Sequence, residues 1–218
     1  MPNTKKIVIF GGTGGLGKRL TPHFDIYDLL SIGSKDLDLT DSIAVRIFFE
    51  ANDIDIILNF SGYNFNSPIH KYDETNIVER NRQIDVVING NLNILSACLP
   101  KMREKNYGRI ILASSVLSSS PVFGTSVYSG CKAFVDNLVK TCSVENLSKG
   151  ITCNSLQLGY MDGGLTYRVP ESLREKIFNN LPLKRWGHIE EIVSAIIFLI
   201  KTEYVSGISL KINGGINY

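Results

Sequence analysis

Three side chains capable of proton transfer lie close together in the middle of the chain. The apolar run 109–113 predicts a strand, and Ser115 follows at its carboxyl end, where open parallel sheets bind their ligands. Tyr128 and Lys132 are four residues apart in the segment 126–140, whose apolar residues recur at helical spacing, so they share a helix face. An ammonium beside a phenol lowers a tyrosine pKa from about 10. The three residues therefore predict an acid/base site in which the serine holds a substrate oxygen.

A glycine-rich turn near the amino terminus supports this prediction. Support is needed because the spacing of Tyr128 and Lys132 alone is also typical of a half-buried tyrosine and a solvated lysine with no catalytic role. The apolar strand 6–10 runs directly into Gly11-x-x-x-Gly15-x-Gly17, which opens a short helix. Glycines in this context allow a tight turn and a close approach of the backbone to a pyrophosphate. The turn therefore predicts a phosphate-binding site, and a purely structural turn is the alternative.

The end of the next predicted strand, 27–33, indicates which dinucleotide the chain binds. An acidic residue at this point would pair with a ribose 2′-hydroxyl, whereas a cation accommodates a 2′-phosphate. Lys35 therefore favours NADP, with Ser34 as a further hydrogen-bond donor, while Asp36 leaves NAD possible. If the backbone stays extended, the side chains of Lys35 and Asp36 diverge and Lys35 lies nearer the phosphate. A solvated lysine at a strand end is the alternative interpretation.

Strands and helices alternate along the chain without repeats or linkers. A crossover between parallel strands needs a dozen or more residues, so no helix fits between Gly33 and Leu37. The pattern predicts a single domain, residues 1–218, with an α/β fold: one doubly wound parallel sheet with helices on both faces. The predicted strands are 6–10, 27–33, 55–62, 109–113, 151–159 and 207–212, and the helices are 42–52, 77–105 with a bend near Asn89–Gly90 and Pro100, 126–140, 171–178 and 187–200.

The composition is that of a globular protein and argues against several other classes. The chain has 218 residues, 44% hydrophobic and 20% charged, with a formal net charge of +2, far from the basic excess of nucleic-acid-binding proteins. No apolar run reaches the ~18 residues of a membrane span, and Met1 to Lys6 lead directly into a strand. The four cysteines form no metal-like cluster and indicate reduced core thiols. We expect a cytoplasmic protein with no metal, no nucleic acid and no membrane partner.

Several motifs in one order resemble those of the short-chain dehydrogenase/reductase family, and the resemblance covers nearly the whole chain. The serine, tyrosine and lysine named above occur at the intervals of that family. The other matching segments are Gly11-x-x-x-Gly15-x-Gly17, Asp38-Leu39-Thr40-Asp41, Asn59-Phe60-Ser61-Gly62, Leu158-Gly159, Pro182 to Gly187 and Asn213-Gly214-Gly215.

The resemblance implies a Rossmann-type fold and a role for each matching residue. Ser115, Tyr128 and Lys132 would be catalytic, and Tyr128 and Lys132 would also contact the cofactor. The other implied cofactor contacts are Gly11, Thr13, Gly14, Gly15, Leu16, Gly17, Ser34, Lys35, Asp38, Leu39, Asn59, Ser61, Gly62, Gly159 and Met161.

Three departures from the family pattern affect the site. The helix between the second and third strands is missing, which trims the adenosine side. Val87 stands where the asparagine of the catalytic tetrad is expected, and Asn91, one helical turn along, is either a substitute or an ordinary helix-face residue. Gly163 stands where a threonine usually contacts the nicotinamide amide.

The sequence therefore predicts an NADPH-dependent reductase of a ketone or aldehyde, reversible as an alcohol dehydrogenase. One alternative is a catalytically weak or inactive NAD(P)-binding sensor or assembly protein on the same fold. Another is a reductase of nucleotide-linked sugars, although the segment 160–181 is short for a lid over a bulky nucleotide. Because the helices 77–105 and 126–140 carry more apolar residues than one sheet face requires, and the family pairs them between subunits, we expect a homodimer or homotetramer.

Overall fold

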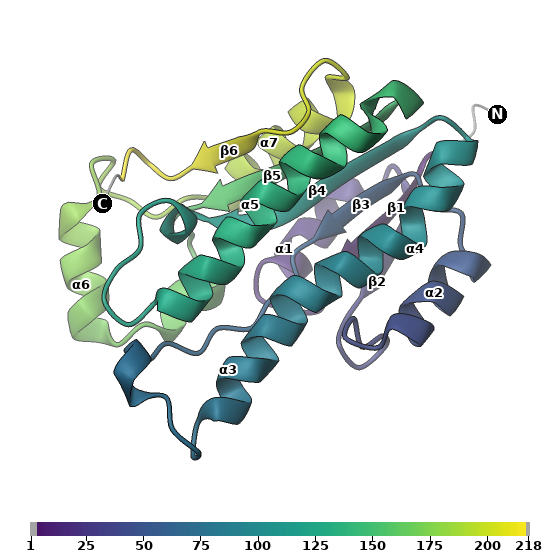
Figure 1. Cartoon of the computed structure of the whole chain (residues 1–218). Coiled ribbons are helices and arrows are strands. Elements are labelled where there is room, and N and C mark those ends of the chain that lie inside the picture. Colours follow the sequence, from purple (N-terminus) through teal and green to yellow (C-terminus); the bar gives the residue numbers. More distant parts are fainter. Residues whose placement is uncertain (1–3, 217–218) are drawn as a thin grey trace.

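The computed structural model describes residues 4–216, which form one six-stranded parallel sheet between layers of helices (Figure 1). The strand order is β2-β1-β3-β4-β5-β6, and every neighbouring pair is parallel. The strands are β1 (Lys6–Phe10), β2 (Asp28–Ile32), β3 (Ile56–Asn59), β4 (Gly108–Ser115), β5 (Ile151–Leu158) and β6 (Ser209–Ile212). The predicted doubly wound sheet is confirmed.

Helices cover both faces of the sheet (Figure 1). The longer helices α2 (Ser42–Ala51), α4 (Gly90–Glu104) and α5 (Ser126–Asn146) lie on one face, and α1 (Gly17–Leu20) and α7 (Ile189–Lys201) lie on the other. Two further helices, α3 (Ile77–Ile84) and α6 (Glu171–Asn180), project beyond the sheet. Short 3₁₀ turns occur at Thr21–Phe24, Ile69–Lys71, Val116–Ser118, Leu147–Lys149 and Gly164–Arg168, and a π-helical turn occurs at Asp85–Asn89.

The alternation of side chains along the strands divides the core into two layers. In β1, Val8 and Phe10 are fully buried under the α2, α4 and α5 layer. Ile7 and Ile9 are fully buried on the other face, against α1 and α7. Strands buried on both faces read as continuous apolar runs, which explains why the sequence predicted β1 with the observed bounds.

The sheet has one strand fewer than usual on the β2 side. The usual doubly wound order, 3-2-1-4-5-6, has a further strand outside the second one. Here β2 is an edge strand within the described residues, and 33–41 form turns that lead directly to α2. The structure therefore confirms that no helix lies between Gly33 and Leu37, and it lacks the outer strand as well. The adenosine side of any bound dinucleotide has less protein around it.

The helix predicted over 77–105 is divided into α3, the π-helical turn and α4. The predicted bend near Asn89–Gly90 coincides with the end of the π-helical turn, where the Gly90 N–H bonds the Asp85 carbonyl five residues back. Pro100 lies inside α4 without ending it, and α5 continues six residues beyond the predicted Lys140. Within residues 4–216, no helix is long and apolar enough to cross a membrane.

Candidate active site

Ser115, Tyr128 and Lys132 converge at the carboxyl end of β4. Ser115 is the last residue of that strand, and its Oγ accepts a hydrogen bond of 3.2 Å from the Leu117 N–H. Tyr128 lies in the first turn of α5 and Lys132 one turn later. All three are buried, with exposed fractions of 7%, 8% and 5%. The structure therefore brings together the three side chains that the sequence singled out.

A polar loop fixes the point at which α5 begins. Thr125 Oγ1 accepts a hydrogen bond from the Val122 N–H at 3.1 Å, donates to the Val122 carbonyl at 2.7 Å and lies 2.9 Å from Ser129 Oγ. Gly124, just before it, has a φ of +83°, which glycine adopts readily. These contacts hold the first turn of α5, and with it Tyr128, against the end of β4.

Lys132 is held by a single strong hydrogen bond. Its Nζ donates to the Ala113 carbonyl at 2.7 Å and lies 5.9 Å from the centre of the Tyr128 ring. Burial lowers the pKa of Lys132 to about 8, although the carboxylate of Asp136 acts in the opposite direction. A lysine in this range changes its charge close to physiological pH.

The pKa of Tyr128 differs from the sequence-based expectation. Burial raises it to about 12, the nearby Ser115 hydroxyl lowers it and Tyr160 raises it. The expectation that Lys132 lowers this pKa below 10 is wrong for the protein without a cofactor, because desolvation of the phenolate outweighs the other effects. Tyr128 is therefore protonated at neutral pH, as a proton donor must be.

The glycine-rich turn follows β1 at the same carboxyl edge of the sheet, with β3 between β1 and β4. Gly11 has a φ of +74°, and a Cβ there would come within 2.6 Å of the Ser61 N–H nitrogen. A Cβ on Gly17 would lie 2.1 Å from the Gly11 carbonyl oxygen. The Gly14 N–H bonds the Gly11 carbonyl at 2.9 Å, which closes the turn. The Thr13 side chain packs over Gly33 at the end of β2.

The segment after β5 covers part of this turn. Gly164 lies so close to Gly15 that a Cβ on Gly15 would come within 2.7 Å of its Cα, and Leu16 packs against Gly164 on the other side. Gly163 and Gly164 have φ values of +114° and +60°. The Arg19 guanidinium lies 3.8 Å from the Asp162 carboxylate and so joins the two segments. The consecutive glycines were the sequence signal for this approach, which we had not predicted.

The residues after β2 form a turn instead of the extended backbone expected at Lys35 and Asp36. The Leu37 N–H bonds the Gly33 carbonyl at 3.1 Å, and Asp36 Oδ2 accepts the Gly33 N–H at 2.8 Å. We expected extended backbone to make the two side chains diverge and to place Lys35 nearer a 2′-phosphate. The backbone is not extended, so this expectation is wrong, because the hydrogen-bonded turn is more stable here than a continued edge strand. Ser34 and Lys35 are nevertheless exposed at the strand end, while the Asp36 carboxylate turns back onto the chain.

Asp38 and Leu39 lie between this turn and α2. Asp38 Oδ1 accepts from the Thr40 N–H at 2.9 Å and from Thr40 Oγ1 at 2.8 Å, and these bonds lower the pKa of Asp38. Leu39 is buried against Gly90, and its carbonyl accepts from Asn93 Nδ2 at 2.9 Å. The predicted adenine-contacting segment is thus anchored to α4.

Asn59, at the end of β3, organises the next loop. Its Oδ1 accepts from the Ser61 N–H at 3.0 Å and from Ser61 Oγ at 2.5 Å, and Gly62 follows on the surface. Its Nδ2 donates to Asn91 Oδ1 at 2.7 Å. Asn91 is buried, and its own Nδ2 donates to the Val87 carbonyl at 2.6 Å. Asn91 therefore ties α4 to β3 and is not an ordinary surface residue.

Two remaining predicted contacts lie at the end of β5. Gly159 packs against Asn213, and a Cβ there would come within 2.8 Å of the Asn213 Cα. Met161 is buried, with its side chain against Gly187 in the α7 layer of the core. Only the backbone of Met161 is therefore placed to meet a ligand, because its side chain points into the core.

The chain is similar in sequence to known reductases. Residues 35–217 match the family model described as enoyl-(acyl carrier protein) reductase. Nodulation protein G of Azospirillum brasilense is 32% identical over 189 residues, which cover 84% of this chain and 74% of that protein. The 3-oxoacyl-[acyl-carrier-protein] reductase of Buchnera aphidicola is 30% identical over 187 residues, which cover 83% of this chain and 74% of that protein.

A solved structure shares the fold. A small-chain dehydrogenase in complex with NADPH superposes with a TM-score of 0.85 over 98% of each chain, at 20% sequence identity. The match to the family model extends over most of the chain, and the relatives align with more than four fifths of it. The chain therefore belongs to the short-chain dehydrogenase/reductase family of NAD(P)-dependent oxidoreductases.

Proposed function

We propose that the protein is an NADPH-dependent reductase that converts a ketone or aldehyde to an alcohol, reversibly. The observation that carries the proposal is the convergence of buried Ser115, Tyr128 and Lys132 at the carboxyl edge of the sheet, the edge that also carries the glycine-rich turn. The similarity to a 3-oxoacyl-[acyl-carrier-protein] reductase makes 3-oxoacyl thioesters, with their ketone at C3, the first substrate class to test.

The residues present fit a dinucleotide. Gly11 and Gly17 pack against neighbouring backbone and so allow a tight turn, and residues 13–15 between them are exposed, where a pyrophosphate could meet the backbone. The closely placed Gly164 would lie over the same turn. When bound, the nicotinamide supplies the hydride. Lys132 would hold the nicotinamide ribose, as the family resemblance implies.

The protein's own groups would handle the substrate oxygen and the proton. Ser115 would donate a hydrogen bond to the carbonyl oxygen, and Tyr128 would transfer its proton to that oxygen as the alcohol forms. The high pKa of Tyr128 keeps the proton available, and the protonated Lys132 stabilises the phenolate that remains. A general acid of this kind contributes roughly 10²–10⁴-fold to the rate.

NADPH fits the end of β2 better than NADH. Asp36 uses one carboxylate oxygen to hold the turn at Gly33, whereas Lys35 is exposed and forms no ion pair within the described residues. A free cation at this place favours a 2′-phosphate. Calorimetric titration that gave tighter binding of NADH would overturn this part of the proposal.

The function is tested by a turnover screen of ketones, aldehydes and 3-oxoacyl thioesters with NADPH and NADH, followed by the oxidation of the coenzyme. We expect turnover of at least one carbonyl class with NADPH, and Lys132→Ala should lose both rate and coenzyme affinity. Tight NADPH binding without turnover of any carbonyl would indicate a binding protein, a role that the position of Val87 favours. Loss of only rate, or only affinity, in Lys132→Ala would contradict its two roles.

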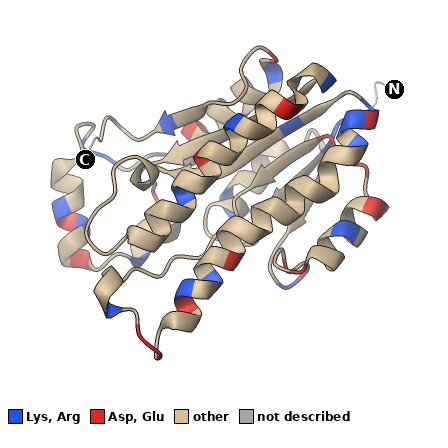
Figure 2. Ribbon diagram, in the orientation of Figure 1, with Lys and Arg blue, Asp and Glu red and all other residues tan. Residues whose placement is uncertain are grey.

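We also propose that the protein forms a dimer or tetramer through α4 and α5. Charged residues occur in α4 only in its last turn, at Lys101, Arg103 and Glu104 (Figure 2). The outer face of α5 is exposed at Gly130 and Ala133, whose small side chains allow close packing of a second helix. Light scattering at micromolar concentration should give at least twice the monomer mass of 24.2 kDa, and a monomer would contradict the proposal.

A further inference from the structure

A second buried charge lies one helical turn beyond Lys132 on α5. Asp136 is only 7% exposed, and each of its carboxylate oxygens accepts a short hydrogen bond. Ser155 Oγ donates to Oδ1 at 2.6 Å, and Gln157 Nε2 donates to Oδ2 at 2.6 Å. An ionised carboxylate only accepts hydrogen bonds, and bonds to it are shorter than neutral ones. The geometry is that of a charged Asp136.

Within residues 4–216, the donors that reach this carboxylate are neutral. Ser155 and Gln157 come from β5, and Ser118 from the 3₁₀ turn bonds Gln157 Nε2 at 3.0 Å without touching the carboxylate. In β6, Ser209 bonds Ser155 at 2.9 Å. Neutral donors stabilise a buried charge, but they do not balance it, and an unbalanced buried charge is costly.

The cation that balances Asp136 is Lys132. The two residues are four apart in α5, so their side chains share one face of the helix. Figure 2 shows the alternating basic and acidic bands along α5. The other nearby cations are Lys140, one turn after Asp136, and Lys211, beside Gln157 in β6; both are exposed, so solvent screens their charges, whereas Lys132 is buried. Lys132 is the buried cation of this part of the molecule.

We propose that Asp136 is a positioning residue for the reaction: its buried carboxylate keeps Lys132 protonated beside Tyr128. The catalytic consequence rests on the proposed function, but the charge pair itself does not. Burial alone favours the neutral lysine, and Asp136 opposes that effect. The hydrogen bond to the neutral Ala113 carbonyl adds no opposite charge, so without Asp136 the ammonium would be buried and unbalanced.

Other groups that face Lys132 cannot replace this charge. On α5 these are Tyr128 and Cys131, and burial raises the pKa of both, so both are neutral near pH 7. The end of β4 presents only serines and a carbonyl group. The loop after β5 contributes the phenol of Tyr160, and the π-helical turn packed against α5 has its carboxylate, Asp85, exposed and bonded to Asn89. Asp136 is thus the one buried carboxylate described near the site.

The pair can be tested in the full chain without cofactor or substrate by NMR titration of lysine labelled with ¹³C at Cε. The Lys132 signal is assigned by its absence from Lys132→Met. In Asp136→Asn, which keeps the shape and one accepting oxygen for Gln157 while the Ser155 hydroxyl can turn to accept from the new amide, we expect the Lys132 signal to titrate about one pH unit lower or more than in the wild type. Asp136→Glu, which keeps the charge, should titrate near the wild type. Asp85→Asn, at an exposed carboxylate, is the control and should change nothing.

A shift of less than about 0.3 pH units in Asp136→Asn would overturn the proposal. An opposite charge close to a buried group moves the pKa of that group by about one unit or more. If Asp136→Asn does not fold, the double variant with Lys132→Met becomes decisive. It should fold, because it removes both charges and leaves neither unbalanced. If the double variant folds as poorly as Asp136→Asn alone, the role of Asp136 in folding depends on its bonds to Ser155 and Gln157 alone. That result would contradict the pairing of Asp136 with Lys132.

The kinetic consequence is a displaced pH profile. In Asp136→Asn, the loss of carbonyl-reducing activity at high pH should begin about one pH unit lower, with near wild-type activity below that range. A uniform loss of activity at every pH, with the same midpoint, would contradict the positioning role. If no carbonyl is turned over but the NMR titration shows the shift, the proposed function fails while the charge pair stands.

Discussion

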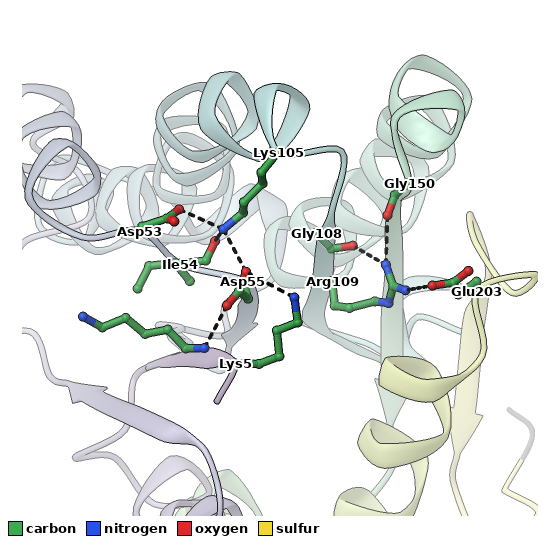
Figure 3. Close-up of polar contacts among 10 residues, drawn as sticks. Lys5, Asp53, Ile54, Asp55, Lys105, Gly108, Arg109, Gly150 and Glu203 are labelled. Carbon is green, nitrogen blue, oxygen red and sulfur yellow. Dashed lines mark hydrogen bonds and ion pairs between the residues drawn. The ribbon is translucent and has the colours of Figure 1, made fainter. Parts of the chain in front are cut away.

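The two ends of the parallel sheet treat buried charge in opposite ways. At the amino end of the strands, Figure 3 shows two groups of polar contacts, one around Asp55 and Lys105 and one around Arg109. At the carboxyl end, Lys132 has one hydrogen-bond acceptor and Tyr128 is buried with its proton. At the amino end of the sheet, buried charged groups are paired with hydrogen-bond acceptors and opposite charges. At the carboxyl end, ionisable groups remain available for chemistry.

At the amino end, each cationic group has several partners. Lys105 Nζ lies 2.8 Å from Asp53 and 2.9 Å from Asp55, and it also donates to the Ile54 carbonyl at 2.7 Å (Figure 3). Arg109, whose side chain is 3% exposed, donates to three carbonyl oxygens and to Glu203 at 2.6 Å. Because the three Lys105 donors and four of the five Arg109 donors are used, these residues tie α4, β4 and β5 together.

The comparison shows that burial of a charge has two different uses. Where partners saturate the charge, burial fixes structure; where they do not, the low local dielectric shifts a pKa toward the working range. Lys132, with its pKa moved to about 8, and Arg109, with four acceptors, are the two extremes. Variants at the two ends should therefore separate activity from stability.

The largest effect is expected for Tyr128→Phe, which removes only a hydroxyl. Reduction should fall by roughly 10²–10⁴-fold because the ring still packs but has no proton to give. NADPH affinity and the melting temperature should stay close to those of the wild type. Steady-state rates, calorimetric titration and a thermal melt check the three expectations. Retention of more than about a tenth of the rate would rule out Tyr128 as the acid.

The complementary variant at the amino end is Arg109→Met, which keeps the length of the side chain but removes its donors. The carbonyl oxygens that it leaves unpaired should lower the free energy of unfolding by about 2–4 kcal/mol. Denaturant titration measures this loss, and the rate per folded molecule should be unchanged. Lys149→Met, at an exposed lysine near the amino end of β5, is the control and should matter little. A large loss in the control, or a loss of activity in Arg109→Met, would break the division between the two ends.

Much of the fold was predictable because it depends on local patterns. The β1 bounds, the short helix after the glycine-rich turn and the absence of a helix before Leu37 followed from apolar runs and from spacing. The absence of a strand outside β2 was not predicted, because strand order depends on pairing between segments that are distant in sequence. The end of α5 was also missed, since the buried Cys142 and Asn146 in its last turns weaken the apolar periodicity.

The candidate site was predictable in its residues but not in its electrostatics. Spacing alone placed Tyr128 and Lys132 on one helix face, yet the high pKa of Tyr128 depends on burial by elements distant in sequence. Asp136 was missed although it lies four residues after Lys132, where the same helical spacing could have found it. The link from Asn91 to Asn59 joins residues 32 apart in sequence, and no local pattern reveals such a contact.

A smaller effect is expected at the trimmed edge, where Lys35→Ala tests the cofactor preference. Loss of a partly shielded cation should reduce the preference for NADPH over NADH by roughly tenfold, or about 1.4 kcal/mol. Calorimetric titration with both coenzymes measures it. Lys149→Ala, at an exposed lysine near the amino end of β5, should leave the ratio unchanged. An unchanged ratio in Lys35→Ala would show that this lysine lies away from the 2′-phosphate.

The smallest effect is expected for Glu191→Gln. This variant tests whether the position of an ion pair in the fold or its burial determines how much the pair contributes to stability. Glu191 bonds Arg185 at 2.7 Å and the His188 N–H at 2.7 Å at the start of α7, and its side chain is 39% exposed. The Arg185 guanidinium and the His188 N–H lower its pKa to about 2. A carboxylate with a lowered pKa stabilises the fold above its unfolded pKa of about 4.5, and this stabilisation is lost as the pH falls toward 2.

Glu191→Gln keeps an acceptor for the His188 N–H and removes the charge together with one of the two acceptors for Arg185. Because solvent screens so exposed a pair, the melting temperature at pH 7 should fall by at most a few degrees. The difference from the wild type should shrink as the pH is lowered from 4.5 toward 2, where the wild-type carboxylate gains its proton. Thermal melts across this range check both expectations. A fall at pH 7 as large as that of Arg109→Met would mean that ion pairs at the two ends contribute alike regardless of burial.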